Sequence, residues 1–367
     1  MPVCNKAVHS FAEGKDASEE ALLTIRLSIT MRRERTSRRC SARTRLTARF
    51  LSRHSMRVHH LNCISSCPLG GKLFDSRTPS LLRRGELTCH CLLVESHEGL
   101  VLIDTGFGQR DLADPRSRLS AFFLFMLKPE FREEMTAIRQ IERLGFSAAD
   151  VRHIVLSHLD FDHAGGLDDF PHATVHMLRI ERDYAAKQRT WLDRQRFRPQ
   201  QWSTQRNWQL HDATGGDRWH DFEYVRPLSS SVDDIALVPL RGHTFGHAGI
   251  AVRNETRWLL LAADAYFFHT EMDLERPRST PGLACYQWMM DKDRAARRWN
   301  QARLRKLCAS KDSYGHVDVF CSHDPIEFER ITRRSAGVPV EAFKQPARWR
   351  GERPTDMRGR VMTERVR

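Results

Sequence analysis

The chain has 367 residues, 40% of them hydrophobic, which is enough for one large or two small folded domains. No apolar run approaches the ~18 residues that a membrane-spanning helix needs, so we expect no such helix. The net charge of +13 is carried by the ends, because residues 1–55 hold 12 Lys/Arg and 5 Asp/Glu, and residues 344–367 hold 8 and 3. The near-neutral middle offers no basic groove, so nucleic acid is not the expected partner.

Composition divides the chain into three parts. Residues 1–55 are rich in Arg, Ser and Thr and cannot bury enough apolar surface to offset the entropy of ordering. We predict that they form a basic, disordered N-terminal extension, either downstream of a mis-assigned start codon or acting as an organelle transit peptide. Residues 56–343 are predicted to form the folded domain, and residues 344–367 a basic C-terminal tail.

Cysteine usage indicates a reducing compartment. The nine cysteines are an odd number without zinc-finger spacing, and no clear signal peptide precedes them. We therefore expect mostly reduced thiols in a cytoplasmic protein, with a structural pairing near Cys63 and Cys67 as the alternative.

The predicted elements are buried strands interrupted by a few helices. In chain order, hydrophobic periodicity predicts strands at 87–96 and 99–106, a helix at 131–144, strands at 154–156 and 173–178, a helix at 181–187, strands at 235–240, 249–252 and 258–263, a helix at 291–308 and a strand at 317–321. Strands in hairpin runs favour stacked sheets with helices outside over a doubly wound parallel sheet.

Two segments of this pattern have alternative interpretations. The apolar run Leu119–Leu127 fits a packed helix, a dimer-forming helix, a segment on a membrane surface or a lid over an acyl chain. The segment 190–226 is rich in tryptophan, and its rings either line a substrate pocket or anchor an insertion on the core.

One short segment concentrates four groups that bind transition metals. His158, Asp160, Asp162 and His163 lie within six residues, directly after an apolar strand that ends at Leu156. Imidazole and carboxylate are ligands for zinc, manganese or iron. Four such groups on one strand-end loop would repel one another and lose their hydration unless a cation neutralised them. The segment therefore predicts a metal-binding loop.

Three later segments each present a further ligand at the end of an apolar strand. His243 lies in RGHTFGH, Asp264 ends the strand LLLAAD, and His323 lies in CSHDP. Strand ends gather at one edge of a sheet sandwich, so we expect these three side chains to share one site with the loop at 158–163.

The order of these motifs resembles the metallo-β-lactamase superfamily. The chain follows the family's order of motifs: H-x-[HDE]-x-D-H, then G-H-T-x-G-H, then an Asp at a strand end, and then S-H-D. Asp104-Thr105-Gly106 is similar to the family's early Asp-x-Gly turn. The likeness covers about residues 87–325 and is greatest to the branch that holds acyl-homoserine lactonases. It implies an α+β fold, an αββα sandwich of two mixed β-sheets flanked by helices, for a hydrolase domain at 56–343.

The resemblance also implies a role for each ligand in a two-metal site. The first metal would be held by His158, Asp160 and His243, the second by Asp162, His163 and His323, and Asp264 would bridge both. His247 would support the ligands without binding a metal. Asp162 would orient the attacking hydroxide and pass a proton to the leaving oxygen. Tyr266 is expected to contact the substrate, with packing as the alternative, because the lactonase branch carries its tyrosine three residues after the bridging Asp and Tyr266 is two after Asp264.

Asp160 departs from the family pattern, in which most members carry His at this position. A carboxylate adds a negative charge and a harder oxygen donor, which moves the metal preference toward iron or manganese. We expect two divalent metal ions, with zinc as the first choice and iron or manganese as the alternatives.

The predicted function is hydrolysis of a lactone or carboxylic ester by a hydroxide that bridges two metals. A glyoxalase II-like thioesterase and a phosphodiesterase or nuclease are the alternatives within the same fold. The expected partner is a small-molecule ester or lactone, and a homodimer is the further partner that the run Leu119–Leu127 allows.

Removing both basic ends separates these functions. Neither 1–55 nor 344–367 is predicted to join the folded domain, so the trimmed protein should hydrolyse a small substrate with kcat/KM within about twofold of the full chain. The two proteins are compared in one assay at one ionic strength. A loss of more than about tenfold would favour a nucleic-acid substrate bound by the basic ends.

Overall fold

The computed structural model describes residues 56–228, 234–254, 257–310 and 316–341. These residues all lie within one compact unit of the chain. The predicted extension at 1–55 and tail at 344–367 lie outside the described residues, and both stay predictions. Among the described helices, none is long and apolar enough to cross a membrane.

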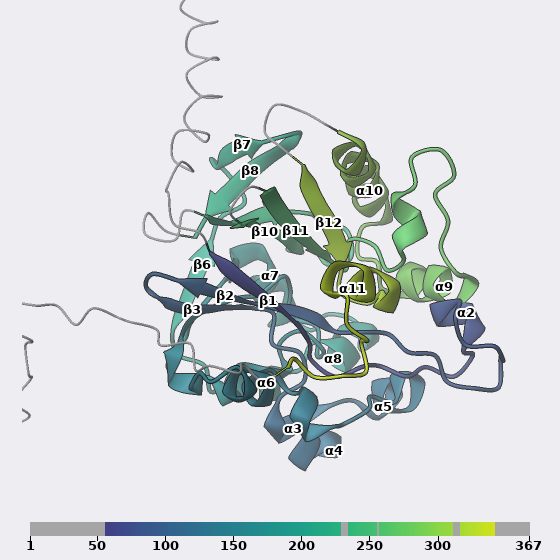
Figure 1. Cartoon of the computed structure of the whole chain (residues 1–367), viewed down its shortest axis with the longest axis horizontal. Helices are drawn as coiled ribbons and strands as arrows, with labels where there is room; N and C mark the ends of the chain where they lie inside the picture. The colour runs from purple at the N-terminus through teal and green to yellow at the C-terminus, as the bar shows by residue number, and fades with distance from the viewer. Residues whose placement is uncertain (1–55, 229–233, 255–256, 311–315, 342–367) are drawn as a thin grey trace, which may run out of the picture. The chain divides into compact units, whose positions relative to one another are not determined.

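Two six-stranded sheets form the frame of this unit (Figure 1). The first sheet has the order β1-β2-β3-β4-β5-β6, with strands Arg57–Asn62, His90–Ser96, Gly99–Ile103, Val151–Val155, Thr174–Leu178 and Trp208–His211. The second has the order β12-β11-β10-β9-β8-β7, with β7 to β12 at Asp217–Trp219, Phe222–Pro227, Ile235–Pro239, Ala248–Asn254, Arg257–Ala263 and Val317–Cys321.

Both sheets are mixed. In the first sheet the pairs β3–β4, β4–β5 and β5–β6 are parallel, whereas the pairs β1–β2 and β2–β3 are antiparallel. In the second sheet only β11 and β12 are parallel, and the other neighbours form antiparallel pairs. The strands β9, β11 and β12 therefore all end at the same edge of their sheet.

Alternating side chains of the strands build the core between the sheets. Leu92 and Val94 of β2 join a buried cluster with Leu237 of β9 and Phe320 of β12. Leu93, between them, joins a second buried cluster on the other face of the first sheet. Because successive side chains on a strand point to opposite faces, both faces of this sheet are buried.

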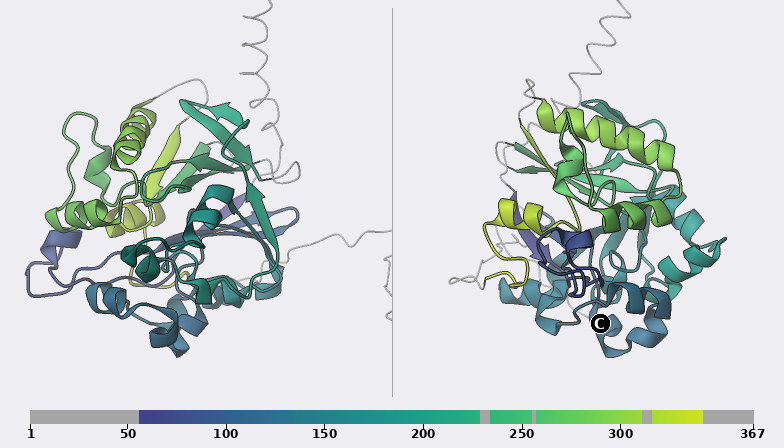
Figure 2. Two further views of the ribbon diagram at one scale, coloured as in Figure 1. Left: turned by 180° about the vertical axis from the view of Figure 1, so that it is seen from behind. Right: turned by 90° about the vertical axis from the view of Figure 1, so that its right-hand side faces the viewer.

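Helices lie outside the two sheets (Figure 2). Their bounds are α2 Lys72–Asp75, α3 Gln109–Ala113, α4 Pro115–Arg118, α5 Ala121–Leu127, α6 Ala137–Arg143, α7 Arg179–Ala185, α8 Trp191–Arg196, α9 Pro281–Met290, α10 Arg294–Ala309 and α11 Pro325–Thr332. Short 3₁₀ turns lie at Glu133–Met135, Ala148–Asp150, Gly165–Asp169, Pro199–Gln201 and His269–Met272. α6 packs on the outer face of the first sheet, and α10 lies against β12. The predicted αββα sandwich of two mixed sheets is confirmed.

Most predicted elements are present with shifted ends. The helix predicted at 131–144 is divided into the 3₁₀ turn Glu133–Met135 and α6, and the helix predicted at 181–187 is α7. The strands β1 and β6 to β8 and the helices α9 and α11 were not predicted. β6 and β7 are short and mostly polar, so they carry too little periodicity to be recognised without the strands beside them.

The apolar run Leu119–Leu127 forms α5. Phe123 and Leu127 are buried in a cluster with Phe161, whereas Phe125 is 87% exposed. α5 is therefore a packed helix with one free aromatic ring, and the homodimer stays a prediction.

The tryptophans of segment 190–226 mostly anchor it. Trp202 is buried under the guanidinium of Arg182, at 4.4 Å from the ring centroid, and Trp219 packs on Trp258 at 5.4 Å. Only Trp191 is largely exposed, beside Phe122 of α5. These rings do not gather around one pocket.

The cysteines within the described residues are free thiols, and most of them are buried. Cys63 and Cys67 are among them, so the alternative of a structural pairing there is wrong. The expectation of reduced thiols holds for this part of the chain.

Candidate metal centre

The ends of parallel strands bring seven imidazole and carboxylate side chains to one edge of the sandwich. The loop after β4 carries His158 to His163, and the loop after β9 carries His243. Asp264 directly follows β11, and His323 lies two residues after β12. All seven of these side chains are buried.

These side chains form two adjoining groups. The first contains His158, Asp160, His243 and Asp264, and the second contains Asp162, His163 and His323. In the first group, Oδ2 of Asp160 lies 3.3 Å from Nε2 of His158 and 2.9 Å from Nε2 of His243. In the second, Nε2 of His163 lies 3.4 Å from Nε2 of His323. Asp162 is the loosest member, at 3.8 Å from His323.

Asp264 connects the two groups through its two oxygens. Its Oδ2 lies 3.3 Å from His243 Nε2 and 3.7 Å from His158 Nε2. Its Oδ1 lies 3.2 Å from His163 Nε2 and 3.1 Å from His323 Nε2. A carboxylate with one oxygen in each group has the geometry of a ligand shared by two cations.

The donor set fits divalent cations. Ligand atoms about 2.0–2.2 Å from one tetrahedral zinc ion lie roughly 3.4 Å from one another, which is close to the separations within each group. Nε2 of His158 is buried without a hydrogen-bond partner in the described part of the chain. A buried imidazole nitrogen rarely lacks a hydrogen-bond partner, and this nitrogen faces two carboxylates. A cation bound between these three groups would give the nitrogen its partner.

Hydrogen bonds behind the cluster fix the orientation of the imidazoles. The carboxylate of Asp104 accepts hydrogen bonds from the backbone N–H and hydroxyl of Ser157 and from Nδ1 of His163, at 2.7–2.8 Å. Nδ1 of His323 donates to the carbonyl of Thr88 at 2.7 Å. Both rings therefore turn Nε2 toward the cluster, as metal-binding imidazoles do when a partner holds the other nitrogen.

His247 has a supporting place. Its Nδ1 donates to the carbonyl of Leu240 at 3.0 Å, and its Nε2 accepts from the backbone N–H of Asp264 at 3.0 Å. Both ring nitrogens are used, so His247 positions Asp264 and has no atom left for a metal.

Charges inside the cluster shift its pKa values strongly. Although burial disfavours the charged ring, Asp264 and Asp104 hold the pKa of His163 well above its usual range. Burial is likewise outweighed at His323, where Asp264 is the main cause that raises the pKa to about 9. Protonated imidazoles thus neutralise the carboxylates when no cation does, and a bound cation would displace these protons.

For Tyr266 the structure agrees with the packing alternative, and a second tyrosine, Tyr286, lies nearer the ligands. Tyr266 is buried, and its hydroxyl donates to the carboxylate of Glu327 at 3.0–3.1 Å rather than facing the ligands. Tyr286 of α9 was not predicted; its ring lies 5.6 Å from that of Phe267, which stacks on His323 at 5.2 Å. Its hydroxyl makes no hydrogen bond within the described residues, and burial together with Asp162, Asp160 and Asp264 raises the pKa of Tyr286.

Arg196 is a second residue that the sequence did not indicate. It ends α8, is fully buried, and donates to both oxygens of Asp160. It lies 36 positions from Asp160 in a segment of no metal-binding character, so only tertiary packing brings the two together.

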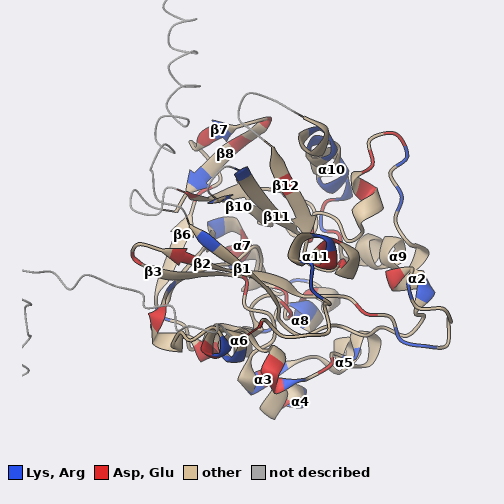
Figure 3. Ribbon diagram, viewed as in Figure 1, with Lys and Arg blue, Asp and Glu red and all other residues tan. Residues whose placement is uncertain are grey.

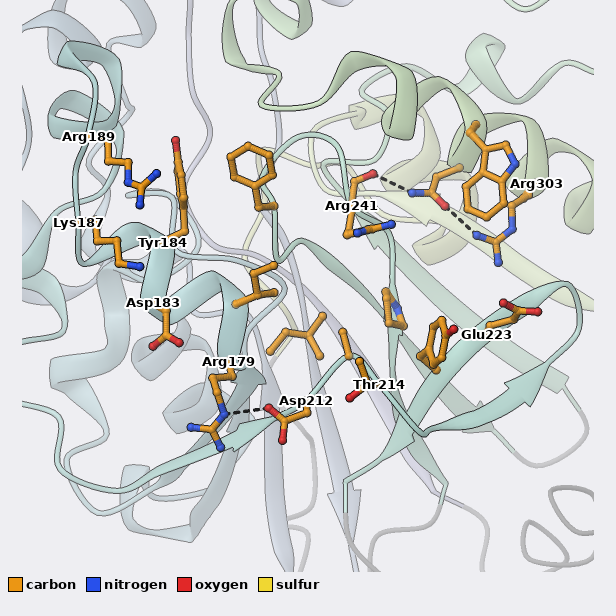
Figure 4. Close-up of a pocket in the computed structure, with 18 residues that line it drawn as sticks. Arg179, Asp183, Tyr184, Lys187, Arg189, Asp212, Thr214, Glu223, Arg241 and Arg303 are labelled. Atoms are coloured by element: carbon orange, nitrogen blue, oxygen red, sulfur yellow. Dashed lines mark hydrogen bonds and ion pairs between the residues drawn. The ribbon is translucent and has the colours of Figure 1, made fainter.

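A separate groove of about 890 Å³ lies beside the outer face of α7 (Figure 4). Side chains of α7, β8 and α10 line it, with both cationic and anionic groups, including the ion pair of Arg179 and Asp212 at 2.9 Å. Arg241 and Phe245 come from the loop that carries His243, but none of the seven ligands lines this groove. It is therefore not the metal centre.

The sandwich and its buried cluster define a metal-dependent hydrolase, and comparisons with known proteins agree. Residues 84–296 match the family model described as the metallo-beta-lactamase superfamily. A Mycobacterium tuberculosis protein named "Probable metallo-hydrolase Rv2300c" is 38% identical over 270 residues, covering 74% of this chain and 81% of its own. The chain belongs to the metallo-β-lactamase superfamily and is a metallo-hydrolase.

More distant relatives carry a narrower name. An N-acyl homoserine lactonase of Bacillus thuringiensis is 26% identical over 215 residues, covering 57% of this chain and 78% of its own. The solved structure of an N-acyl homoserine lactone hydrolase, with N-hexanoyl-L-homoserine bound at its metal centre, has a TM-score of 0.56 at 23% identity. That match covers 76% of this chain and 97% of the other, and it shows the shared fold.

Asp264→Ala tests whether one carboxylate serves both groups. Because each oxygen of Asp264 faces one group, the variant should lose most of both metal equivalents and most turnover together. Metal content is measured by elemental analysis after gel filtration, beside Asp212→Ala, which changes an exposed carboxylate outside the cluster. Two retained metal equivalents in Asp264→Ala would contradict the shared role.

Glu327 should make stability depend on pH. Burial and the neighbouring Asp324 raise the pKa of Glu327 to about 7 from its ordinary 4.5. The unfolded chain loses this proton more readily, so the free energy of unfolding should fall by up to about 3 kcal/mol as the pH rises from about 4.5 to about 7. Glu327→Gln removes this titration, so its Tm relative to the unchanged protein should be higher at pH 8 than at pH 5.

Thermal denaturation at four pH values measures this difference. Glu142→Gln, which changes an exposed glutamate of α6, serves as the control and should show no such trend. An equal Tm difference for Glu327→Gln at pH 5 and pH 8 would exclude Glu327 as the cause.

Proposed function

We propose that this protein hydrolyses a lactone or a related carboxylic ester with two divalent cations, zinc in first place. The observation that carries the proposal is Asp264, whose two oxygens face two groups of buried ligands at 3.1–3.7 Å. Membership of the metallo-β-lactamase superfamily and the lactonase names among distant relatives support the choice of substrate.

The cations would supply a Lewis acid for the substrate carbonyl and lower the pKa of water to near neutrality. The proposed ligands are those of the two groups, with His158, Asp160 and His243 on one side, Asp162, His163 and His323 on the other, and Asp264 shared. Four imidazoles and three carboxylates suit zinc, while the oxygen donors leave iron and manganese as alternatives.

Asp162 is the proposed proton carrier. Its carboxylate is held least tightly within the cluster, and it sits at the side of the second group that is slightly exposed. A carboxylate in this place can take a proton from the attacking water and return it to the departing alkoxide oxygen, so no protein nucleophile is needed.

Tyr286 replaces Tyr266 as the proposed substrate-binding tyrosine. Tyr266 is occupied by Glu327, whereas the hydroxyl of Tyr286 has no partner in the described structure and its ring contacts the Phe267 that stacks on His323. A phenol at this place can donate a hydrogen bond to the substrate carbonyl as negative charge develops on the oxygen.

The apolar surroundings suit a substrate with an acyl or alkyl group. Phe161, between two ligand aspartates, packs with Phe107, Phe123 and Met290, and Tyr286 joins the edge of this cluster. Binding sites for small molecules are largely apolar with a few placed polar groups, and this cluster has that composition.

The basic residues of the described domain do not favour a nuclease. Lysine and arginine gather on α10, while both signs of charge alternate elsewhere (Figure 3). Two of the α10 arginines are already engaged, since Arg297 pairs with Asp291 at 2.7 Å and the guanidinium of Arg303 lies over the rings of Phe222 and Trp299.

A substrate panel tests the proposal. The metal-loaded protein is assayed with an N-acyl homoserine lactone, an aryl ester, a glutathione thioester and a bis-aryl phosphate. We expect the highest kcat/KM with the lactone, at least tenfold above the thioester and the phosphate. A preference for the thioester would indicate a glyoxalase II-like enzyme, and a preference for the phosphate a phosphodiesterase.

Tyr286→Phe isolates the proposed hydrogen bond. The variant keeps the ring and loses only the hydroxyl, so kcat should fall roughly 10²-fold while metal content and Tm stay unchanged. Tyr224→Phe, which changes an exposed tyrosine of β8, is the matched control. An unchanged kcat in Tyr286→Phe would exclude the hydroxyl from the reaction.

A further inference from the structure

Arg196 is built into the first ligand group from a different part of the chain. Its Nε donates to Oδ1 of Asp160 at 2.7 Å and its Nη2 to Oδ2 at 2.5 Å, a parallel pair of charge-assisted hydrogen bonds. Its Nη1 donates to the carbonyl of Met290 at 2.6 Å. The guanidinium is fully buried, so its position is set by these bonds and not by solvent.

The helix that carries Arg196 is itself held in place. Thr190 and Asp193 form a capping box at the start of α8, and Asp193 also pairs with Lys292 and accepts from the hydroxyl of Tyr184. Directly after Arg196, the backbone of Phe197 pairs with that of Asp160 in an isolated antiparallel bridge. Arg196 and Asp160 are thus joined through both backbone and side chain.

The charges of the cluster explain why such a partner is needed. Three ligand carboxylates meet in a buried space, and Asp160 adds its charge beside two imidazoles that are neutral when they bind a metal. A buried charge without a partner is costly, and so is a buried guanidinium. Together, Asp160 and Arg196 are neutral and still leave Oδ2 pointing at His158 and His243.

We propose that Asp160 and Arg196 act as one neutral ligand unit in the first metal position, with Arg196 as the positioning residue. This proposal rests on the two-cation site of the proposed function. Arg196 fixes the orientation of the carboxylate and cancels its charge, so that the unit contributes an oxygen donor without adding to the net charge of the centre.

The same contact sets a requirement on His243. Nη2 of Arg196 lies 2.8 Å from Nε2 of His243, the nitrogen that faces the first group. That nitrogen has one lone pair, so it serves either the guanidinium or a cation. In the proposed unit the cation takes the lone pair and Arg196 remains bound to Asp160 and Met290.

Four variants test the unit through metal binding rather than activity. Arg196→Met leaves the carboxylate uncompensated, and Asp160→His leaves the guanidinium uncompensated. The double variant Asp160→His with Arg196→Met replaces the neutral pair by a neutral imidazole. Arg196→Lys keeps the charge and loses the paired hydrogen bonds.

Metal content and affinity are measured by elemental analysis and by titration with Co²⁺ followed by its visible spectrum. The unchanged protein should bind two equivalents. Arg196→Met and Asp160→His should each bind the metal of the first group at least tenfold more weakly than the unchanged protein. The affinity of Arg196→Lys for this metal should be intermediate. The double variant should again bind two metal equivalents. Circular dichroism and Tm identify any variant that does not fold. If Arg196→Met does not fold, the metal affinity of Arg196→Lys is compared with that of the unchanged protein instead.

Arg118→Met is the matched control. Arg118 is also buried and pairs with the buried carboxylate of Asp111 at 2.7 Å, and among the described residues none of its hydrogen bonds or ion pairs is to one of the seven ligands. It should lose stability and keep both metal equivalents.

Three results would overturn the proposal. The first is that Arg196→Met binds two metal equivalents with unchanged affinity. The second is that the double variant binds the first-group metal no more tightly than the single variants. The third is that Arg196→Met binds metal more tightly, which would make Arg196 a competitor of the cation. A protein that binds no metal before any substitution would instead refute the proposed function itself.

Discussion

Three carboxylates and four imidazoles crowded into one buried volume are the constraint on which the rest of this structure depends. Uncompensated, such a cluster would cost more free energy than the roughly 5–15 kcal/mol by which a folded domain is stable. Positive charge must therefore come from bound cations, from protons on His163 and His323, or from Arg196. In the proposed function, the cations that would relieve the crowding are also those that would activate water, so folding and chemistry would share one set of charges.

The sandwich tolerates this cluster because rigid strand ends hold it. Asp104 and Ala263 both have left-handed backbone, with φ of 52° and 46°, an uncommon conformation for residues other than glycine. Asp104 follows β3 and Ala263 directly precedes Asp264, so each bend redirects the chain at the exit of a strand toward the site. Strain at functional positions persists only where the surrounding structure enforces it, and here two buried sheets do so.

The sequence allowed prediction of those elements whose residues show a recognisable pattern within a short segment. Long apolar strands such as β11 carry their own periodicity, which predicted stacked sheets with helices outside, and His158 to His163 concentrate ligands within one loop, which predicted a metal site. The αββα arrangement and the role of each ligand were implied by the family resemblance alone. The strands β6 and β7 could not, because they are short and polar and exist through pairing with their neighbours. Tyr286 and Arg196 could not either, since α9 and α8 reach the centre only through tertiary packing.

The position of Arg196 gives the segment 190–226 a role at the ligand cluster as well as on the core. From its composition this segment is an insertion anchored by tryptophans, yet α8 at its start supplies the group that closes on Asp160. A carboxylate at residue 160 and an arginine at residue 196 are therefore dependent on each other, because either one alone would be a buried charge without a partner. If the proposed unit of Asp160 and Arg196 is correct, a change from Asp to His at residue 160 would be tolerated only where the arginine is lost with it. The insertion and the metal centre then form one structural unit, joined by a single ion pair.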